Sequence, residues 1–146
     1  MNTKTLIITV SMLLTLAQAK AENYTLLVYE NQEALKLRFD KDKAKMDAYW
    51  NEFNQFAAIL QQAKVLRSGK AFKTASDIKT VTIKGEKVEV KDVAYAKSKE
   101  VLGGIYMIDV PDLETAISYA KKATSRTGIT IEVLGPQENP TRKMKK

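Results

Sequence analysis

Three segments of the chain have the hydrophobic pattern of β-strands. Residues 24–29 read Tyr-Thr-Leu-Leu-Val-Tyr, residues 105–110 read Ile-Tyr-Met-Ile-Asp-Val, and residues 129–134 form a third apolar run after Gly128. Alternate side chains of a strand project to opposite faces of its sheet, and in the first two segments both sets are largely apolar. The pattern therefore predicts a sheet that is covered on both sides.

The clearest helical pattern runs from Asp40 or Asp42, either of which can cap the N-terminus, to about Lys64. Its apolar residues recur at helical spacing. They are Met46, Tyr49, Trp50, Phe53, Phe56, Ala57 and Leu60. An aromatic stripe of this kind can line a ligand site, but at this spacing it more often packs on a sheet, and we interpret it as core.

Two shorter patterns complete the domain. Residues 78–83 and 87–90 alternate apolar with polar around Lys84-Gly85-Glu86, which predicts a β-hairpin. Asp112 is a natural cap for a second helix, and Gly128 ends it. The apolar face expected for this helix consists of Leu113, Ala116, Ile117, Ala120 and Ala123. Gly103-Gly104, before the strand at Ile105, indicates a bulge or a close backbone approach.

The order strand, long helix, hairpin, strand, helix, strand predicts an α+β domain with an antiparallel sheet and both helices on one face. Such a domain leaves the other sheet face uncovered. Apolar surface left in water there costs roughly 25 cal/mol per Å². We therefore expect a homodimer in which a second copy covers this face.

The N-terminus has the layout of a secretory signal peptide. Lys4 precedes the apolar run Leu6–Leu16, and small residues follow at Ala17, Ala19 and Ala21. The run is shorter than the roughly 20 residues that a spanning helix needs. Residues 1–19 are thus expected to be removed, with cleavage after Ala19 or Ala21. The mature protein would be periplasmic or secreted, with no integral membrane segment.

Composition narrows the chemistry. The chain has neither cysteine nor histidine, which excludes disulfides, thiolate metal sites, cysteine nucleophiles and histidine bases, so we expect no metal and no cofactor. The formal net charge is +7, which favours acidic partners. Nucleic acid is not expected as a partner, because the chain shows no phosphate-cradling glycine loop or arginine cluster. Residues 20–136 form the expected domain, and residues 137–146 a disordered basic tail.

An ordered set of segments resembles the YCII-related family, also called DGPF-domain proteins. The segments are Tyr24–Tyr29, Lys97–Gly104 (which reads Lys-Ser-Lys-Glu-Val-Leu-Gly-Gly), Ile105–Val110, Leu113–Ala116 and Ile131–Val133. The resemblance covers about residues 24–134. It implies a ferredoxin-like fold that assembles as a dimeric α+β barrel, in agreement with the layout above.

The chain departs from the family at the motif that gives it its second name. Where Asp-Gly-Pro-Phe is expected, this sequence has Asp92-Val93-Ala94-Tyr95. Loss of the glycine and proline changes the backbone freedom of this loop. Asp92 is the candidate catalytic residue, as a proton acceptor, although an aspartate here more often braces a loop. Tyr95, Arg67 and Tyr29 are the candidate ligand-binding residues.

Two hypotheses about function follow. The first is a noncatalytic protein of the bacterial envelope that binds a small acidic ligand or serves as an accessory protein, which suits the predicted export, positive charge and missing catalytic groups. The second is a metal-free lyase, isomerase or dehalogenase with Asp92 as base, which the resemblance alone implies. Replacing Asp92 by Asn discriminates between them.

Overall fold

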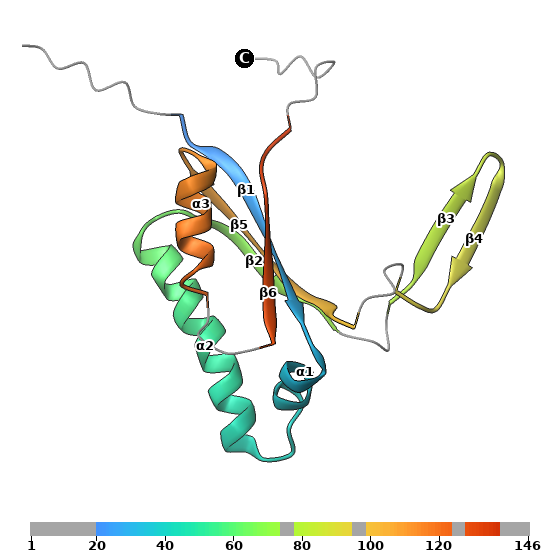
Figure 1. Ribbon diagram of the computed structural model, residues 1–146, viewed down its shortest axis with the longest axis horizontal. Helices are drawn as coiled ribbons and strands as arrows, with labels where there is room; N and C mark the ends of the chain where they lie inside the picture. Colours follow the sequence, from blue (N-terminus) through green and yellow to red (C-terminus); the bar gives the residue numbers. More distant parts are fainter. Residues whose placement is uncertain (1–19, 74–77, 95–98, 124–127, 138–146) are drawn as a thin grey trace, which may run out of the picture.

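The computed structural model of the 146-residue chain describes residues 20–73, 78–94, 99–123 and 128–137. The predicted signal peptide and the basic tail beyond residue 137 lie outside these ranges. Figure 1 shows the arrangement of the elements. In chain order they are β1 (Glu22–Glu30), α1 (Gln32–Arg38), α2 (Lys43–Gln62), β2 (Leu66–Ala71), β3 (Thr80–Lys84), β4 (Lys87–Lys91), β5 (Val101–Val110), α3 (Leu113–Ala120) and β6 (Ile129–Leu134).

Four strands form one antiparallel sheet in the order β2-β5-β1-β6. Helix α2 lies in the connection from β1 to β2, and α3 in the connection from β5 to β6. In neither case are the two strands direct neighbours in the sheet, which is the split βαβ pattern of ferredoxin-like folds. Helices α2 and α3 cover the same face of this sheet (Figure 1). The predicted α+β, ferredoxin-like class is therefore confirmed.

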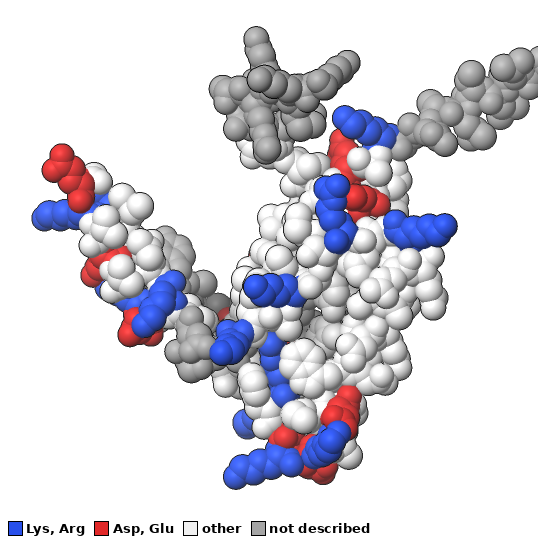
Figure 2. Space-filling model, turned by 180° about the vertical axis from the view of Figure 1, so that it is seen from behind, with Lys and Arg blue, Asp and Glu red and all other residues white. Residues whose placement is uncertain are grey.

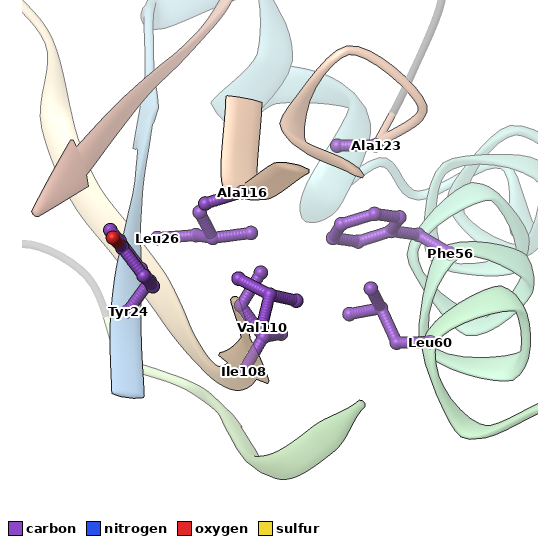
Figure 3. Packing of buried hydrophobic residues seen from close by; sticks show 8 residues of the cluster. All are labelled: Tyr24, Leu26, Phe56, Leu60, Ile108, Val110, Ala116 and Ala123. Carbon is purple, nitrogen blue, oxygen red and sulfur yellow. The ribbon is translucent and has the colours of Figure 1, made fainter. Parts of the chain in front are cut away.

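The core lies between this covered face and the two helices. Figure 3 shows how its side chains from the sheet and the helices point toward one another. The buried cluster consists of Tyr24, Leu26, Phe56, Leu60, Ile108, Val110, Ala116 and Ala123. The alternation along β1, in which Tyr24, Leu26 and Val28 are buried and their neighbours only half-buried, places one face of the strand in this core.

The two helices contribute less of their apolar surface to the core than their patterns predict. On α2, Tyr49, Phe56 and Leu60 are buried, but Trp50 and Phe53 are only partly covered. On α3, Ala116 is buried, whereas Leu113 and Ile117 are exposed. Helix α3 has only eight residues, and of its expected apolar face only Ala116 is fully buried within the helix.

Helix α1 was not predicted, because its seven residues carry too few apolar positions to show a period. Asn31 caps it by accepting hydrogen bonds from the backbone N–H groups of Glu33 and Ala34, both at 3.0 Å. The backbone N–H of Asn31 in turn donates to the carbonyl of Gly128, which adopts a positive φ of 85°. This contact ties the start of α1 to the turn that enters β6.

The predicted hairpin forms strands β3 and β4, with Gly85 at a positive φ of 60° in its turn. Among the described strands these two pair only with each other. The hairpin stands off from the rest of the molecule on the side of the sheet away from α2 and α3 (Figure 1). We call the sheet face on that side the open face. It carries half-buried side chains that alternate with the core residues: Thr25, Leu27, Tyr29, Ile105 and Met107.

Candidate functional site

The candidate site is a cavity of about 360 Å³ between α2 and the β2–β5 edge of the sheet. Trp50, Phe53 and Tyr106 give it aromatic walls, while Glu30 and Arg38 contribute charged groups from the ends of β1 and α1. The site thus lies where the first strand, the unpredicted short helix and the long helix meet.

A buried ion pair forms part of the lining. Arg38 Nη1 lies 2.8 and 2.9 Å from the two carboxylate oxygens of Glu30, and the two residues are 4% and 2% exposed. Arg38 Nη1 also donates to the carbonyl of Gly103 at 3.2 Å, and Nη2 donates to the carbonyl of Phe72. One guanidinium therefore joins α1 to β1, β5 and the segment after β2. A buried charge pair is favourable only when further hydrogen bonds of this kind satisfy it.

One nitrogen atom of the Arg38 guanidinium has no described partner. Its Nε is buried and has no hydrogen-bond partner within the part of the chain that the structure describes. The guanidinium also lies over two aromatic rings, 4.9 Å from the centroid of Trp50 and 5.6 Å from that of Phe39. A buried donor without an acceptor costs about 1–3 kcal/mol, so an added acceptor at Nε would be favourable.

Gly103 makes room for the Glu30 carboxylate. A Cβ at this position would lie 2.5 Å from Glu30 Cδ, closer than real Cβ contacts come. The register between β1 and β5 shifts here, because Val28 pairs with Gly104 and Tyr29 with Leu102, which leaves Gly103 as the extra residue of a bulge. The bulge predicted from the glycine pair is therefore confirmed, and it lies directly at the site.

Tyr49 completes the polar cluster. Its hydroxyl donates to Glu30 Oε1, and the side chain is fully buried on α2. Burial, and secondly this hydrogen bond to a carboxylate, raise the pKa of Tyr49 well above its usual value. Tyr49 is thus a neutral donor at any physiological pH, and it braces the carboxylate rather than supplying a proton.

The cavity has an excess of positive charge. Its charged lining residues are Glu30, Arg38 and the exposed Lys70 on β2, so one carboxylate faces two cations. Asn54 and Gln61 of α2 add polar groups at the exposed side. This combination of aromatic walls and a few polar groups is typical of small-molecule sites, and the charge favours a ligand with acceptor oxygens.

The candidate catalytic residue lies elsewhere. Asp92 follows β4 at the base of the hairpin, with its side chain 76% exposed and 2.6 Å from Lys79 Nζ. Next to it, the Thr80 hydroxyl donates to the Val93 carbonyl at 2.6 Å. Asp92 is not among the described residues that line the cavity. In this structure it joins the two ends of the hairpin.

The candidate ligand-binding residues do not gather at the cavity either. Arg67 lies on the open face of the sheet, where its Nε is 3.3 Å from Asp109 Oδ2. Tyr29 lies on the same face, and its hydrogen bond with Glu132 together with burial raises its pKa. Tyr95 lies outside the described residues. Of the residues that line the cavity, the aromatic residues of α2 were interpreted as core from the sequence. Glu30 and Arg38 were not predicted as site residues.

Two signals in the sequence point to the missed residues. Glu30 continues the alternation of β1 at a core-facing position, where a carboxylate needs a buried partner. Gly103 is the second signal, because a glycine within a strand often indicates that another group packs closely against the backbone there. Arg38 has no comparable signal in the sequence around it. It lies eight residues after Glu30, and only the fold brings the two side chains into contact.

The described ranges contain no group of three acidic side chains that could hold a metal ion. Nor does any helix in them have the length and apolar character needed to cross a membrane.

The fold and the cavity together define a ferredoxin-like α+β domain. It has a pocket beside its long helix α2, and the buried Glu30–Arg38 pair forms part of the pocket wall. The family model of the YCII-related domain matches residues 23–133, so the chain belongs to the YCII-related domain family. No curated protein matches the chain.

Proposed function

We propose that this protein binds a small acidic molecule in the cavity between α2 and the sheet, without transforming it. The observation that carries the proposal is Arg38, which is buried in the cavity wall under Trp50 and has an Nε donor without a described partner. A carboxylate or similar group would accept this hydrogen bond, and charge-assisted bonds of this type are about twice as strong as neutral ones.

The size and walls of the cavity suit a flat compound. About 360 Å³ lies at the small end of the range of roughly 300–1,000 Å³ found for ligand sites. Trp50 and Phe53 on α2 and Tyr106 on β5 provide ring surfaces. We therefore expect an aromatic or conjugated acid of one or two rings, with its acidic group toward Arg38 and Lys70.

Trp50 makes the proposal easy to test, because it is the only tryptophan of the chain and lines the cavity. The probe is 2-naphthoate, and its neutral match is 2-naphthamide. We expect 2-naphthoate to shift the single indole N–H resonance in NMR spectra and to bind about tenfold more tightly than the amide, as one charge-assisted hydrogen bond allows.

A pair of variants shows whether the cavity is the binding site. Ala57→Leu fills space in the cavity from α2, whereas Ala48→Leu changes an exposed position of the same helix that does not line it. Ala57→Leu should abolish binding of 2-naphthoate, and Ala48→Leu should leave it unchanged. Equal binding of the acid and the amide, or binding that survives Ala57→Leu, would contradict the proposal.

Asp92→Asn separates binding from the alternative of a lyase, isomerase or dehalogenase in which Asp92 is the base. The exposed pair with Lys79 supports a bracing role for Asp92. In a binding protein the Asn variant keeps its affinity for 2-naphthoate. An enzyme of the alternative type would instead lose turnover of its substrate on this substitution.

We further propose that the protein is exported and works as a homodimer. Export rests on the signal-peptide pattern of residues 1–19, and the dimer on the apolar residues of the open face. Protein recovered from its natural host should have the intact mass of a chain that begins at Lys20 or Glu22. A mass that includes Met1 or Asn2 would contradict export.

A further inference from the structure

The hairpin of β3 and β4 presents an unusual surface. Its cross-strand pairs Val81–Val90 and Ile83–Val88 are two positions apart, so their side chains share one face. All of these side chains are between 57% and 70% exposed. The other face carries Thr80, Thr82, Lys84, Lys87, Glu89 and Lys91. The hairpin is thus amphipathic, and no other part of the described chain covers its apolar face.

A two-stranded hairpin is marginally stable by itself, and a row of β-branched side chains in water gives it no support. An exposed, contiguous apolar patch on a paired strand is typical of a surface that contacts another molecule. Exposed edge strands are usually protected against association by charged side chains, proline, bulges or a covering element. Here the charges are confined to one face, which indicates that the other face is covered in the working protein.

The position of the hairpin indicates what covers it. It stands on the side of the sheet opposite α2 and α3, so it flanks the open face (Figure 1). Figure 2 shows it as a separate arm with open space between it and the body. A second copy seated on the open face would lie beside this arm. Leu27, Ile105 and Met107 of the open face and the apolar face of the hairpin would then form one continuous apolar surface.

We infer that the β3–β4 hairpin is a clasping arm, whose face of Val81, Ile83, Val88 and Val90 packs against a second copy of this chain. In a symmetric dimer each copy contributes one arm and receives the other, so both apolar surfaces of both copies are covered at once. The inference rests on the proposed homodimer and adds to it a second, reciprocal contact outside the sheets.

The first test exchanges valine for threonine, which keeps β-branching and nearly the same shape while replacing an apolar methyl group by a polar hydroxyl. The triple variant Val81→Thr/Val88→Thr/Val90→Thr should raise the dissociation constant of the dimer by about tenfold or more, measured by sedimentation. The matched control is Thr82→Val, the reverse exchange on the opposite face, which should leave the constant unchanged.

The second test uses the absence of cysteine from the chain, since a single introduced thiol can be followed alone. Ile83→Cys lies on the apolar face of the hairpin and Thr82→Cys on the opposite face. The rate of maleimide reaction should fall about tenfold for Ile83→Cys as the protein is concentrated into the dimer, and should stay constant for Thr82→Cys.

The outcomes separate the arm from the dimer. If the wild-type chain stays monomeric, the homodimer is wrong and the arm with it. If the wild type dimerises but the triple variant dimerises equally well and Ile83→Cys stays reactive, the arm alone is overturned. Protection of Ile83→Cys only when a different protein is added would likewise overturn it.

Discussion

At the scale of single residues, the most demanding position is Gly103. The Glu30 carboxylate, held by Arg38 and Tyr49, occupies the space that a side chain at residue 103 would need. A buried carboxylate is tolerated only because it accepts three hydrogen bonds, two from Arg38 Nη1 and one from the Tyr49 hydroxyl. Small size at residue 103 is thus a requirement of the polar cluster, not of a turn.

Gly103→Ala should therefore destabilise the fold by about 1–3 kcal/mol, the usual cost of forcing an extra group into a packed interior. Denaturant unfolding measures this free energy. Gly135→Ala is the matched control, because a Cβ there meets nothing nearer than 3.4 Å. Equal stability of the two variants would show that Glu30 can move away without cost.

Tyr49 links the same cluster to pH. Its pKa is raised by burial and by Glu30, whereas in the unfolded chain a tyrosine ionises near its ordinary pKa of 10.0. The contribution of Tyr49 to stability is then fully present below about pH 10 and is lost as the pH rises further, because the unfolded state releases the proton first.

Tyr49→Phe should make the fall in unfolding free energy above about pH 10 less steep, since one tyrosine with a raised pKa is removed. At neutral pH the variant should lose about 1.5–3 kcal/mol, the contribution of a hydrogen bond to a charged group. Urea unfolding at pH 7 and at about pH 11 measures both effects. An unchanged alkaline slope would contradict the assignment.

At the scale of elements, the caps show how local chemistry sets helix ends. Asp42, one of the two residues predicted as possible caps, caps α2, and Asp112 caps α3 by accepting a hydrogen bond from the backbone N–H of Thr115 at 2.7 Å. This hydrogen bond lowers the pKa of Asp112 below its ordinary value of 3.8. Both caps were readable from the sequence, because an aspartate directly before a helical pattern needs no distant partner.

At low pH, Asp112→Asn should have the same free energy of unfolding as the wild type. This free energy should also change less with pH in the variant. The stabilisation by the Asp112 carboxylate is present above pH 3.8 and is lost as the pH falls through its lowered pKa. Asn keeps an acceptor for Thr115 but cannot ionise, and Asp112→Ala loses the cap at every pH. Acid unfolding curves of the two variants test this; parallel curves for all three proteins would refute it.

At the scale of the whole molecule, two apolar surfaces have no helix packed on them within the described ranges: the half-buried open face and the exposed face of the hairpin. A dimer that covers the open face predicts a solution mass of twice the mature chain at micromolar concentration. Leu27→Lys places a charge in the middle of the open face and should give a folded monomer, because burying an unpaired charge is costly.

Light scattering after size exclusion measures this mass. Gln55→Lys, on the exposed side of α2, adds the same charge away from the open face and should remain dimeric. A wild-type mass of one chain, or a dimer that persists in Leu27→Lys, would contradict assembly through the open face.

The sequence by itself determined strands β1, β5 and β6, helices α2 and α3, their aspartate caps, the hairpin and the antiparallel class of the sheet. It did not predict β2, which forms one edge of the sheet. The predicted features follow from side-chain periodicity and local hydrogen bonding, which act between residues a few positions apart. The local sequence also indicates the bulge at Gly103-Gly104. It does not show that the Glu30 carboxylate occupies the space beside Gly103.

Only the tertiary structure decided the site. The cavity joins residues from β1, α1, α2, β2 and β5, and its central pair, Glu30 and Arg38, forms because Gly103 and Phe72, far along the chain, supply the remaining acceptors. Asp92, in contrast, is conspicuous in the sequence but stands in solvent beside Lys79. Burial and convergence, which create a binding site, depend on packing between distant segments and leave no periodic trace in any one of them.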